Sequence, residues 1–432
     1  MKIYSYTDLS KQNIEDLCLR QLSDDDSIAD RVKNIISRVK AEGDKALFSY
    51  ALDFDKVELK QLYIGKQEIE DIASTIPEDA RKAIDTAYAN IRKFHAAQLY
   101  KEAAIETMPG VSCWREARAI ERVGLYIPGG TAVLPSTFLM LAIPAVLAGC
   151  KEIVVCSPPQ KDGKTNCYLA YCALLLGIEK IYMVGGAQAI AAMAFGTETM
   201  PKVYKIFGPG NRYVTQAKQL VLASGMTAID MPAGPSEVLV FADETANPAF
   251  VASDLLAQAE HGADSQAILV STSSQLIRET LEQVEIQLKA LPREAIAAQA
   301  IANSYAVLVE NTLQAMDFSN TYAPEHLILA TDAFSELIPM ISNAGSVFLG
   351  NLTPESAGDY ASGTNHTLPT SGFAKAYSGV SVDSFIKKIT FQQISPEGLT
   401  AIGPTVEILA AAEGLQAHKN AITIRLKSRD GY

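Results

Sequence analysis

Histidine is scarce in this chain, and its few positions indicate where chemistry could occur. The 432 residues include five histidines, His95, His261, His326, His366 and His418. His95 lies within "KFHAAQ" and is expected to be a surface or packing residue, whereas the other four stand beside acids, glycines or turn residues. Imidazole can move a proton near neutral pH or bind a metal ion. Each position alone more often marks a structural hydrogen-bonded group than a ligand, but four together favour a metal or acid–base site built from distant segments.

The stretch "LLAQAEHG", residues 255–262, ends an apolar helix with polar groups. Gln258 and His261 are three residues apart and so share a helical face, whereas Glu260 points about 100° away from His261. Gly262 is expected to end the helix. Completed by an aspartate, a Gln/His pair would suit zinc or a similar divalent ion. Glutamine is a poor metal ligand on its own, so a structural role for the pair stays open.

Glu325 and His326 are adjacent in "APEHL", an arrangement that favours general acid–base chemistry. A histidine can accept a proton near neutrality, and a neighbouring carboxylate can activate water. If the two residues lie in a loop between strands, both side chains could face one reacting centre. An ion pair or a hydrogen bond at a strand end explains the same residues equally well.

The elements that must position these groups alternate between strand and helix from residue 121 onward. One series runs from "RVGLYIPGG" to "KVYKIFGPG", and a second runs from "EVLVFAD" through "HLILAT" to "GSVFLG". Such alternation over short Gly/Pro turns predicts parallel sheets with helices on both faces. The predicted fold class is therefore α/β, with two doubly wound, Rossmann-like domains and a cleft between them.

Four parts are expected along the chain. They are a mainly helical N-terminal region that packs partly on the second α/β domain (1–120), a first α/β domain (121–234), a second α/β domain (235–380) and a C-terminal tail domain (381–432). The tail is too short to form a generous core of its own and should pack on the body or on a partner subunit.

Three glycine turns are expected at strand ends of the first α/β domain, at Gly129-Gly130, Gly185-Gly186 and Gly208-Pro209-Gly210. Each could bring backbone amides close to an anion such as a pyrophosphate, although each alone can be a plain turn. Their position at carboxyl ends of strands is where open α/β sheets bind ligands. Tyr126, Gln188 and Asn211 lie in these turns and could hold ribose hydroxyls or an amide.

Composition argues against several classes of protein. The net charge of −12 argues against a nucleic-acid or anionic-membrane partner. Neither a signal sequence nor an apolar stretch long enough for a bilayer span is recognised, so a cytoplasmic protein is expected. The six cysteines include no C-x-x-C pair, which predicts reduced, mostly buried thiols.

Long motifs connect these groups with a known family. The segment "IDMPAGPSEVLVFADETANPAFVASDLLAQAEHG", residues 229–262, resembles the signature of histidinol dehydrogenase. The segments "VGLYIPGG", "FGPGN", "TYAPEHL" and "PESAGDYASGTNHTLPT" resemble that family's other blocks, in the same order. The resemblance implies a zinc-dependent, NAD-linked, four-electron oxidation of L-histidinol to L-histidine through an enzyme-held aldehyde, the last step of histidine biosynthesis.

The resemblance also implies a role for individual residues. His326 would be the general base, and Glu325 would activate water. One zinc per subunit would be held by Gln258, His261, Asp359 and His418. Substrate would be contacted by Ser236, Gln258, His261, His326, Asp359, Glu413 and His418, and NAD by Tyr126, Gln188 and Asn211. Family members are homodimers, so Glu413 and His418 are expected to come from the partner subunit.

Three alternatives remain open. The chain could be a zinc- and NAD-dependent dehydrogenase of another amino alcohol, or a ligand-binding relative without activity. The presence of Glu325, His326 and the four implied metal ligands argues against the second. Aldehyde oxidation could also proceed through a covalent hemithioacetal on Cys113 or Cys150, although neither has an obvious partner to lower its pKa.

Overall fold

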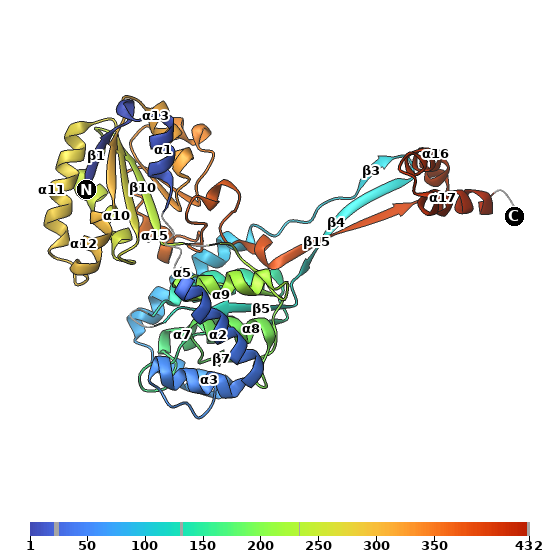
Figure 1. Cartoon of the computed structure of the whole chain (residues 1–432), viewed down its shortest axis with the longest axis horizontal. Helices are drawn as coiled ribbons and strands as arrows, with labels where there is room; N and C mark the ends of the chain where they lie inside the picture. The colour runs from blue at the N-terminus through green and yellow to red at the C-terminus, as the bar shows by residue number, and fades with distance from the viewer. Residues whose placement is uncertain (21–25, 130–132, 233, 430–432) are drawn as a thin grey trace. The chain divides into compact units, whose positions relative to one another are not determined.

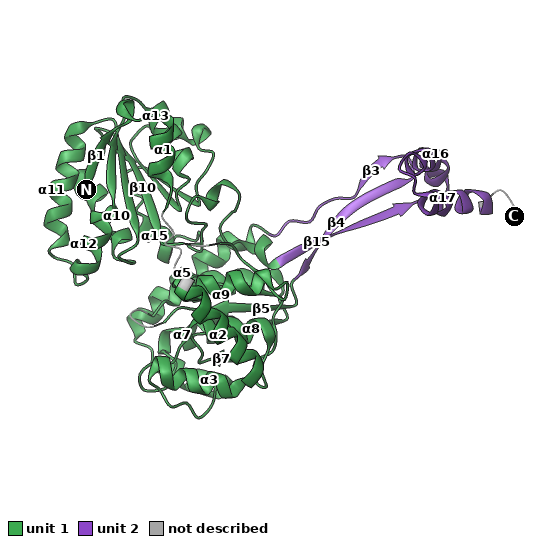
Figure 2. Ribbon diagram, in the orientation of Figure 1, with its two compact units in different colours: residues 1–98, 120–385 green, residues 99–119, 386–432 purple. Residues whose placement is uncertain are grey.

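The computed structural model describes residues 1–20, 26–129, 133–232 and 234–429 (Figure 1). Two compact units divide the chain, one of residues 1–98 and 120–385 and the other of residues 99–119 and 386–432 (Figure 2). The larger unit contains two α/β halves, each built on a six-stranded sheet. No helix among the described ranges is long and apolar enough to cross a membrane.

The first α/β half is built on a mixed sheet in the order β2-β7-β6-β5-β8-β9. All neighbouring strands are parallel except β2, which pairs antiparallel with β7. The strands are β2 (Tyr63–Ile64), β5 (Arg122–Tyr126), β6 (Glu152–Cys156), β7 (Ile181–Tyr182), β8 (Lys205–Phe207) and β9 (Ala228–Ile229).

Helices cover both faces of this sheet, because successive strand residues point to opposite faces. Val155 belongs to a core formed with α5, α6 and α7, whereas Val154 and Cys156 belong to a core formed with α2, α3, α8 and α9. The helices are α2 (Asp26–Glu42), α3 (Asp44–Tyr50), α4 (Lys66–Ala73), α5 (Glu78–Ala96), α6 (Pro135–Ala148), α7 (Cys167–Leu176), α8 (Gly186–Phe195) and α9 (Arg212–Ala223).

The second α/β half is built on a fully parallel sheet in the order β1-β12-β11-β10-β13-β14. Its strands are β1 (Lys2–Ser5), β10 (Glu237–Ala242), β11 (Gln266–Ser271), β12 (Tyr305–Leu308), β13 (His326–Ala330) and β14 (Ser346–Leu349). Val238 and Val240 face one core, and Leu239 and Phe241 face the other. The helices are α1 (Lys11–Cys18), α10 (Pro248–Ala259), α11 (Ser274–Leu288), α12 (Glu294–Ala302), α13 (Thr312–Tyr322), α14 (Phe334–Leu337) and α15 (Glu355–Tyr360).

The smaller unit is an antiparallel sheet followed by two helices. Its strands β3 (Ile105–Met108), β4 (Val111–Ala119) and β15 (Ile386–Ile394) lie in the order β15-β4-β3, and α16 (Pro396–Ala412) and α17 (Gln416–Arg429) come after β15. The expectation of a mainly helical region up to residue 120 is therefore wrong for β3 and β4, which pair with each other, while β4 also pairs with β15 of the C-terminal segment. The four-part division of the chain stays a prediction.

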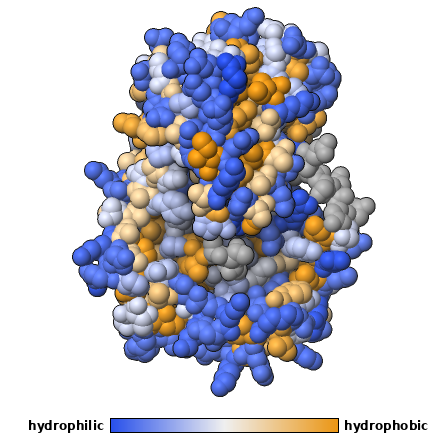
Figure 3. Space-filling view, turned by 90° about the vertical axis from the view of Figure 1, so that its left-hand side faces the viewer, coloured by the Kyte–Doolittle hydropathy of each residue, from blue (hydrophilic) through white to orange (hydrophobic). Residues whose placement is uncertain are grey.

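The face of the larger unit seen in Figure 3 is mostly hydrophilic, with hydrophobic residues scattered between charged ones. The apolar residues of both sheets are instead buried between strands and helices. This distribution is that of an ordinary globular protein.

Candidate active site

Buried polar groups collect at the amino ends of two central strands in the second half. Glu237 opens β10 and His326 opens the neighbouring β13, while Glu325 directly precedes β13. The exposed fractions of Glu237, Glu325 and His326 are 1%, 6% and 2%. His326 does not lie in a loop but begins the strand that the run "HLILAT" predicts, and its backbone pairs with Val238 and Ser346.

The backbone of Glu237 contacts both of the adjacent candidates. Its N–H donates to Glu325 Oε2 over 2.9 Å, and its carbonyl oxygen lies 3.3 Å from His326 Nδ1. A carbonyl can only accept, so Nδ1 carries the ring proton when the imidazole is neutral. His326 Nε2 then keeps its lone pair and lies 3.4 Å from Asp359 Oδ1, within ion-pair range but without a hydrogen bond.

The end of α10 brings Gln258 to the same place. Its side chain is fully buried, and its amide donates to Glu355 Oε1 (2.5 Å) and accepts from the Glu237 N–H (2.7 Å) in the orientation that satisfies both ends. The helix ends at Ala259, so His261 lies beyond it rather than on its last turn as expected. Its N–H still bonds to the Gln258 carbonyl (3.2 Å), which keeps the two residues one turn apart.

The short helix α15 contributes two carboxylates that are four residues apart and therefore share a face. Glu355 and Asp359 are 2% and 9% exposed. Together with His326 they offer three ligand atoms that lie within 4.8 Å of one another. Glu355 was not among the residues predicted from the sequence, although its spacing of four residues from Asp359 is a usable signal.

Burial and crowding of charge perturb this cluster. Desolvation is the main cause that raises the pKa of Glu325 and that of Glu355, each to about 8. Burial lowers the pKa of His326, but the carboxylates around it outweigh burial and raise that pKa well above its usual range. Burial opposes ionisation of Asp359, yet contact with His326 lowers the pKa of this carboxyl. The group thus combines three carboxyls with a single imidazole.

Two buried atoms of the cluster, His326 Nε2 and Glu355 Oε2, have no hydrogen-bond partner among the described residues. An imidazole nitrogen and carboxylate oxygens are ligands that zinc accepts. The surplus of buried carboxyl groups would be relieved by a divalent cation. These residues therefore fit a metal ion.

The remaining candidates differ in their surroundings. Ser236 is half-buried beside Glu237, and His261 is exposed. Desolvation lowers the pKa of the His261 imidazole, and the charge of Asp359 acts in the opposite direction. His366 bonds through Nδ1 to the Asp359 carbonyl (2.9 Å) and through Nε2 to Thr137 Oγ1 (2.9 Å). Glu413, at the end of α16, and His418, on α17, are exposed residues of the smaller unit.

The first half contains a cavity of about 1140 Å³, to which Tyr126, Gln188 and Asn211 all contribute. Tyr126 ends β5, Gln188 lies in the first turn of α8 after β7, and Asn211 caps α9 after β8. All three therefore lie at the carboxyl ends of strands. The volume is that of a pocket for an organic ligand.

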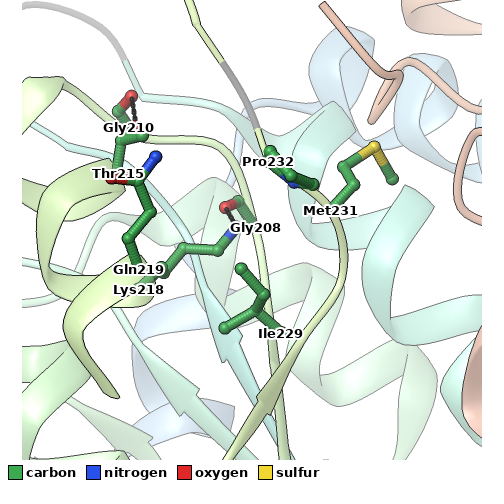
Figure 4. A pocket seen from close by; sticks show the side chains of 8 residues that line it. All are labelled: Gly208, Gly210, Thr215, Lys218, Gln219, Ile229, Met231 and Pro232. Carbon is green, nitrogen blue, oxygen red and sulfur yellow. Dashed lines mark hydrogen bonds between the residues drawn. The ribbon is translucent and has the colours of Figure 1, made fainter. Parts of the chain in front are cut away.

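The glycine turns of this half are largely occupied by the protein itself. The Gly186 N–H donates to the Tyr126 hydroxyl (3.0 Å), and the Gly208 N–H donates to Asp230 Oδ2 (2.8 Å). Lys218 braces the third turn through the Gly208 carbonyl (2.9 Å; Figure 4). Gly208 has a φ of +127°, and a Cβ there would lie 2.1 Å from the Tyr126 carbonyl oxygen, so only glycine fits. Gly130 lies outside the described residues.

The cysteines do not favour covalent catalysis. All six thiols are free, and Cys18, Cys156 and Cys172 are buried. Desolvation raises the pKa of Cys150 to about 11, which leaves little thiolate at neutral pH. Cys113 lies on β4 of the smaller unit. His95 is fully buried, and so belongs to the packing.

Comparisons with known proteins give matches to the same family over nearly the whole chain. Residues 18–426 match the family model described as histidinol dehydrogenase. A histidinol dehydrogenase of Bacteroides fragilis is 57% identical over 99% of both chains. The chloroplastic histidinol dehydrogenase of Arabidopsis thaliana is 50% identical over 99% of this chain and 92% of its own. The crystal structure of histidinol dehydrogenase from Elizabethkingia anophelis superposes with a TM-score of 0.96 at 52% identity, covering 100% of this chain and 99% of the other.

Proposed function

Because this chain belongs to the histidinol dehydrogenase family and is an oxidoreductase, we propose that it oxidises L-histidinol to L-histidine, the last step of histidine biosynthesis, with two NAD⁺ as electron acceptors and one zinc per subunit. The observation that carries the proposal is the buried cluster of Glu325, His326, Glu355 and Asp359. It combines a base, a water-activating acid and metal ligands in one place. The cytoplasm is the proposed location.

The metal would be held by Gln258, His261, Asp359 and His418, the set that the family resemblance implies. The cluster described above shares Asp359 with this set and adds His326 and Glu355 as competing ligands. Zinc, when bound, acts as a Lewis acid and orients the nitrogen and oxygen atoms of the substrate. Its charge would also lower the pKa of His326, which the surrounding carboxylates otherwise keep protonated.

His326 would act as the general base of the first oxidation. Its Nδ1–H faces the Glu237 carbonyl, so Nε2 is the atom that takes the proton of the substrate hydroxyl. NAD⁺, when bound, accepts the hydride in each of the two oxidations. The first step converts the alcohol to the aldehyde and releases one proton to His326.

Glu325 would act in the second oxidation. It would take a proton from water as the water oxygen bonds to the aldehyde carbon, which gives the hydrate in its anionic form. Burial keeps the pKa of Glu325 near 8, a value suited to proton transfer near neutral pH. Loss of a second hydride from the hydrate then yields the carboxylic acid. Ser236 would contact the substrate beside Glu237.

The first half would bind NAD⁺ in its cavity, with Tyr126, Gln188 and Asn211 as contacts. Support comes from their shared position around about 1140 Å³ of space at the carboxyl ends of strands. The Gly186 amide there already bonds to the Tyr126 hydroxyl, so side chains and other amides would hold the pyrophosphate.

We also propose a homodimer in which Glu413 and His418 complete the site of the partner subunit. The smaller unit exposes large apolar side chains near them: Ile408 (70%), Leu409 (59%), Leu415 (45%) and Ile424 (66%). Clustered exposed apolar groups are typical of an interaction surface.

Mixing two inactive variants tests the shared site. His326→Asn and His418→Asn should each be inactive, but their heterodimer would contain one site with both histidines. Activity should therefore return after the two are denatured and refolded together. If His418 served the site of its own chain, the mixture would stay inactive.

The deciding experiment is the stoichiometry of the reaction. Purified protein should form two NADH per L-histidinol consumed, lose the activity on chelation and recover it with zinc. One NADH per histidinol would refute the four-electron reaction. Activity that survives complete chelation would refute the role of the metal.

A further inference from the structure

Arg20 is a nearly buried cation in the second half, with its side chain 10% exposed. Its Nε donates to Glu237 Oε2 over 2.6 Å, and its Nη1 donates to the carbonyl oxygens of Cys18 (2.7 Å) and Tyr322 (2.8 Å). The guanidinium also lies over the Tyr322 ring, 3.5 Å from its centre. One side chain thus joins the segment after α1, the start of β10 and the end of α13.

The contact with Glu237 leads directly to both proposed catalytic residues. Glu237 Oε1 accepts from the Ser371 N–H (2.8 Å), so the carboxylate is held from two sides. The backbone N–H and carbonyl of the same residue contact Glu325 (2.9 Å) and His326 (3.3 Å). A shift of Glu237 would therefore displace both partners together.

The contact with the Tyr322 carbonyl leads to the same pair from the other side. Tyr322 ends α13, and Ala323 then turns the chain with a left-handed φ of 53°. This conformation is unfavourable for alanine and persists only where surrounding contacts hold it. The following residues, Pro324 and Glu325, are fixed through their carbonyls by the N–H groups of Gly345 (2.9 Å) and Ser346 (2.9 Å).

Stability alone is a weak explanation for this arrangement. A buried ion pair often contributes no more to stability than well-packed apolar residues in its place. Arg20 makes three bonds and a ring contact, yet its Nη2 has no partner among the described residues. Two of its contacts, those with Glu237 and with the Tyr322 carbonyl, involve residues that hold or lead into Glu325 and His326.

We propose that Arg20 is a positioning residue, which aligns Glu325 and His326 through Glu237 and the Tyr322 carbonyl. The inference rests on the catalytic roles proposed above, although the alignment can be measured without them. Arg20 itself touches neither substrate nor cofactor in this proposal.

The test uses Arg20→Met, Arg20→Lys and Glu237→Gln in the full-length protein. Arg122→Met is a matched control, because Arg122 bonds to Glu152 Oε2 (2.5 Å) and to the Lys202 carbonyl (2.9 Å) and lies over the Tyr204 ring (5.8 Å). It therefore makes contacts of the same kinds in the first half, away from the cluster, although its side chain is 35% exposed. Melting temperature and zinc content are measured for every variant.

The first readout is independent of activity. Protein labelled with ¹⁵N-histidine should give five sets of ring signals, and His326→Asn identifies the set of His326. Arg20→Met and Glu237→Gln should shift this set and leave those of His95 and His418 in place. Arg122→Met should leave the His326 set where it is.

The second readout is turnover. Arg20→Met should lower kcat by about 10- to 100-fold, since a misplacement of about 1 Å has such an effect. KM for histidinol and zinc content should stay within about twofold. Arg20→Lys should recover part of kcat, because lysine keeps the charge but cannot reproduce the fork of bonds.

Two results for Arg20→Met would overturn the proposal. The first is an unshifted His326 signal together with the kcat of Arg122→Met. The second is an equal shift of all histidine signals, which would mean a general loss of packing. Should Arg20→Met fail to fold, Glu237→Gln decides by the same criteria, because it keeps the shape of the side chain. A wild-type protein that does not oxidise histidinol would refute the proposed function, whereas the histidine signals would still decide on the alignment.

Discussion

The two α/β halves of the larger unit share one topology, yet they present their polar groups at opposite ends of their strands. Counted along the chain, β5 to β9 and β10 to β14 both lie in the order 3-2-1-4-5. In the first half, Tyr126 and Asn211 follow or end strands at their carboxyl ends. In the second half, Glu237 and His326 open their strands at the amino ends.

This difference shows that topology alone does not locate a site. Open α/β sheets commonly bind ligands at the carboxyl ends of strands, and the cavity of the first half follows that rule. The second half departs from it because α10 runs back from the carboxyl end of β10 and delivers Gln258 to the amino edge. Helix α15 adds Glu355 and Asp359 there. The buried charges, rather than the strand order, mark the candidate centre.

The largest expected effect is a loss of turnover on changing the proposed base in the second half, without loss of NAD⁺ binding in the first half. His326→Asn should lower kcat by about 10²- to 10⁴-fold, because the base of the first oxidation is lost, while KM for NAD⁺ stays nearly unchanged. Steady-state kinetics measures both constants. The control is His95→Asn, another fully buried histidine, bonded to Gln98 (3.1 Å), which should keep kcat near the wild-type value. A loss of less than about tenfold for His326→Asn would contradict the assignment.

The next effect concerns the metal. Asp359→Asn should abolish stable zinc binding, and Glu355→Gln should weaken it by about 10- to 100-fold, the usual effect of removing a group that supports a metal ligand. Zinc per chain after equilibrium dialysis measures both affinities. Asp55→Asn, which alters an acid of the cavity in the first half, serves as control. Unchanged zinc affinity in Glu355→Gln would exclude this residue and leave the ligand set implied by the family.

A smaller effect is expected in the first half. Gln188→Ala and Asn211→Ala should each raise KM for NAD⁺ by about 2- to 10-fold, the value of one hydrogen bond, without changing kcat by more than about twofold. Because Asn211 also caps α9, Ser273→Ala, which removes the cap of α11, controls for loss of a helix cap. If kcat fell while KM for NAD⁺ stayed constant, the cavity would not be the NAD⁺ site.

The smallest effect is a difference in pH dependence between the halves. Desolvation raises the pKa of Asp254 in the second half from 3.8 to about 7 and that of Asp55 in the first half from 3.8 to about 6. Between the unfolded and folded values the native state binds more protons, so stability falls as pH rises. Asp254→Asn should flatten the decline between pH 3.8 and about 7, and Asp55→Asn only that between pH 3.8 and about 6.

Urea denaturation of the zinc-free protein at several pH values measures these slopes. Asp53→Asn, an exposed neighbour of Asp55, is the control and should leave the slope unchanged. Equal slopes in Asp254→Asn and the wild type would show that the Asp254 carboxyl is solvated in the native state.

Much of the fold could be predicted from the sequence. The runs "EVLVFAD" and "HLILAT" correspond to β10 and β13, because strands buried on both faces are apolar at successive positions. The parallel, doubly covered sheets were predicted from the alternation of strands and helices over short turns. The stretch at Gln258 was recognised as a helix end because helical spacing and a glycine are both local features. Motif resemblance supplied the family, which the comparisons confirm.

Other features could not be predicted, because they depend on residues far apart in the chain. Strands β3 and β4 are largely solvent-accessible and polar in part, and the pairing of β4 with β15 joins segments that lie far apart in the chain. Arg20 has an ordinary sequence context, and its contact with Glu237 joins residues 217 positions apart. Local sequence determines backbone conformation through steric preferences and burial pattern, so the strands and helices could be predicted from it. Which carboxylate contacts which cation is decided by the packing of distant elements, because a buried, desolvated charge is unfavourable without a partner.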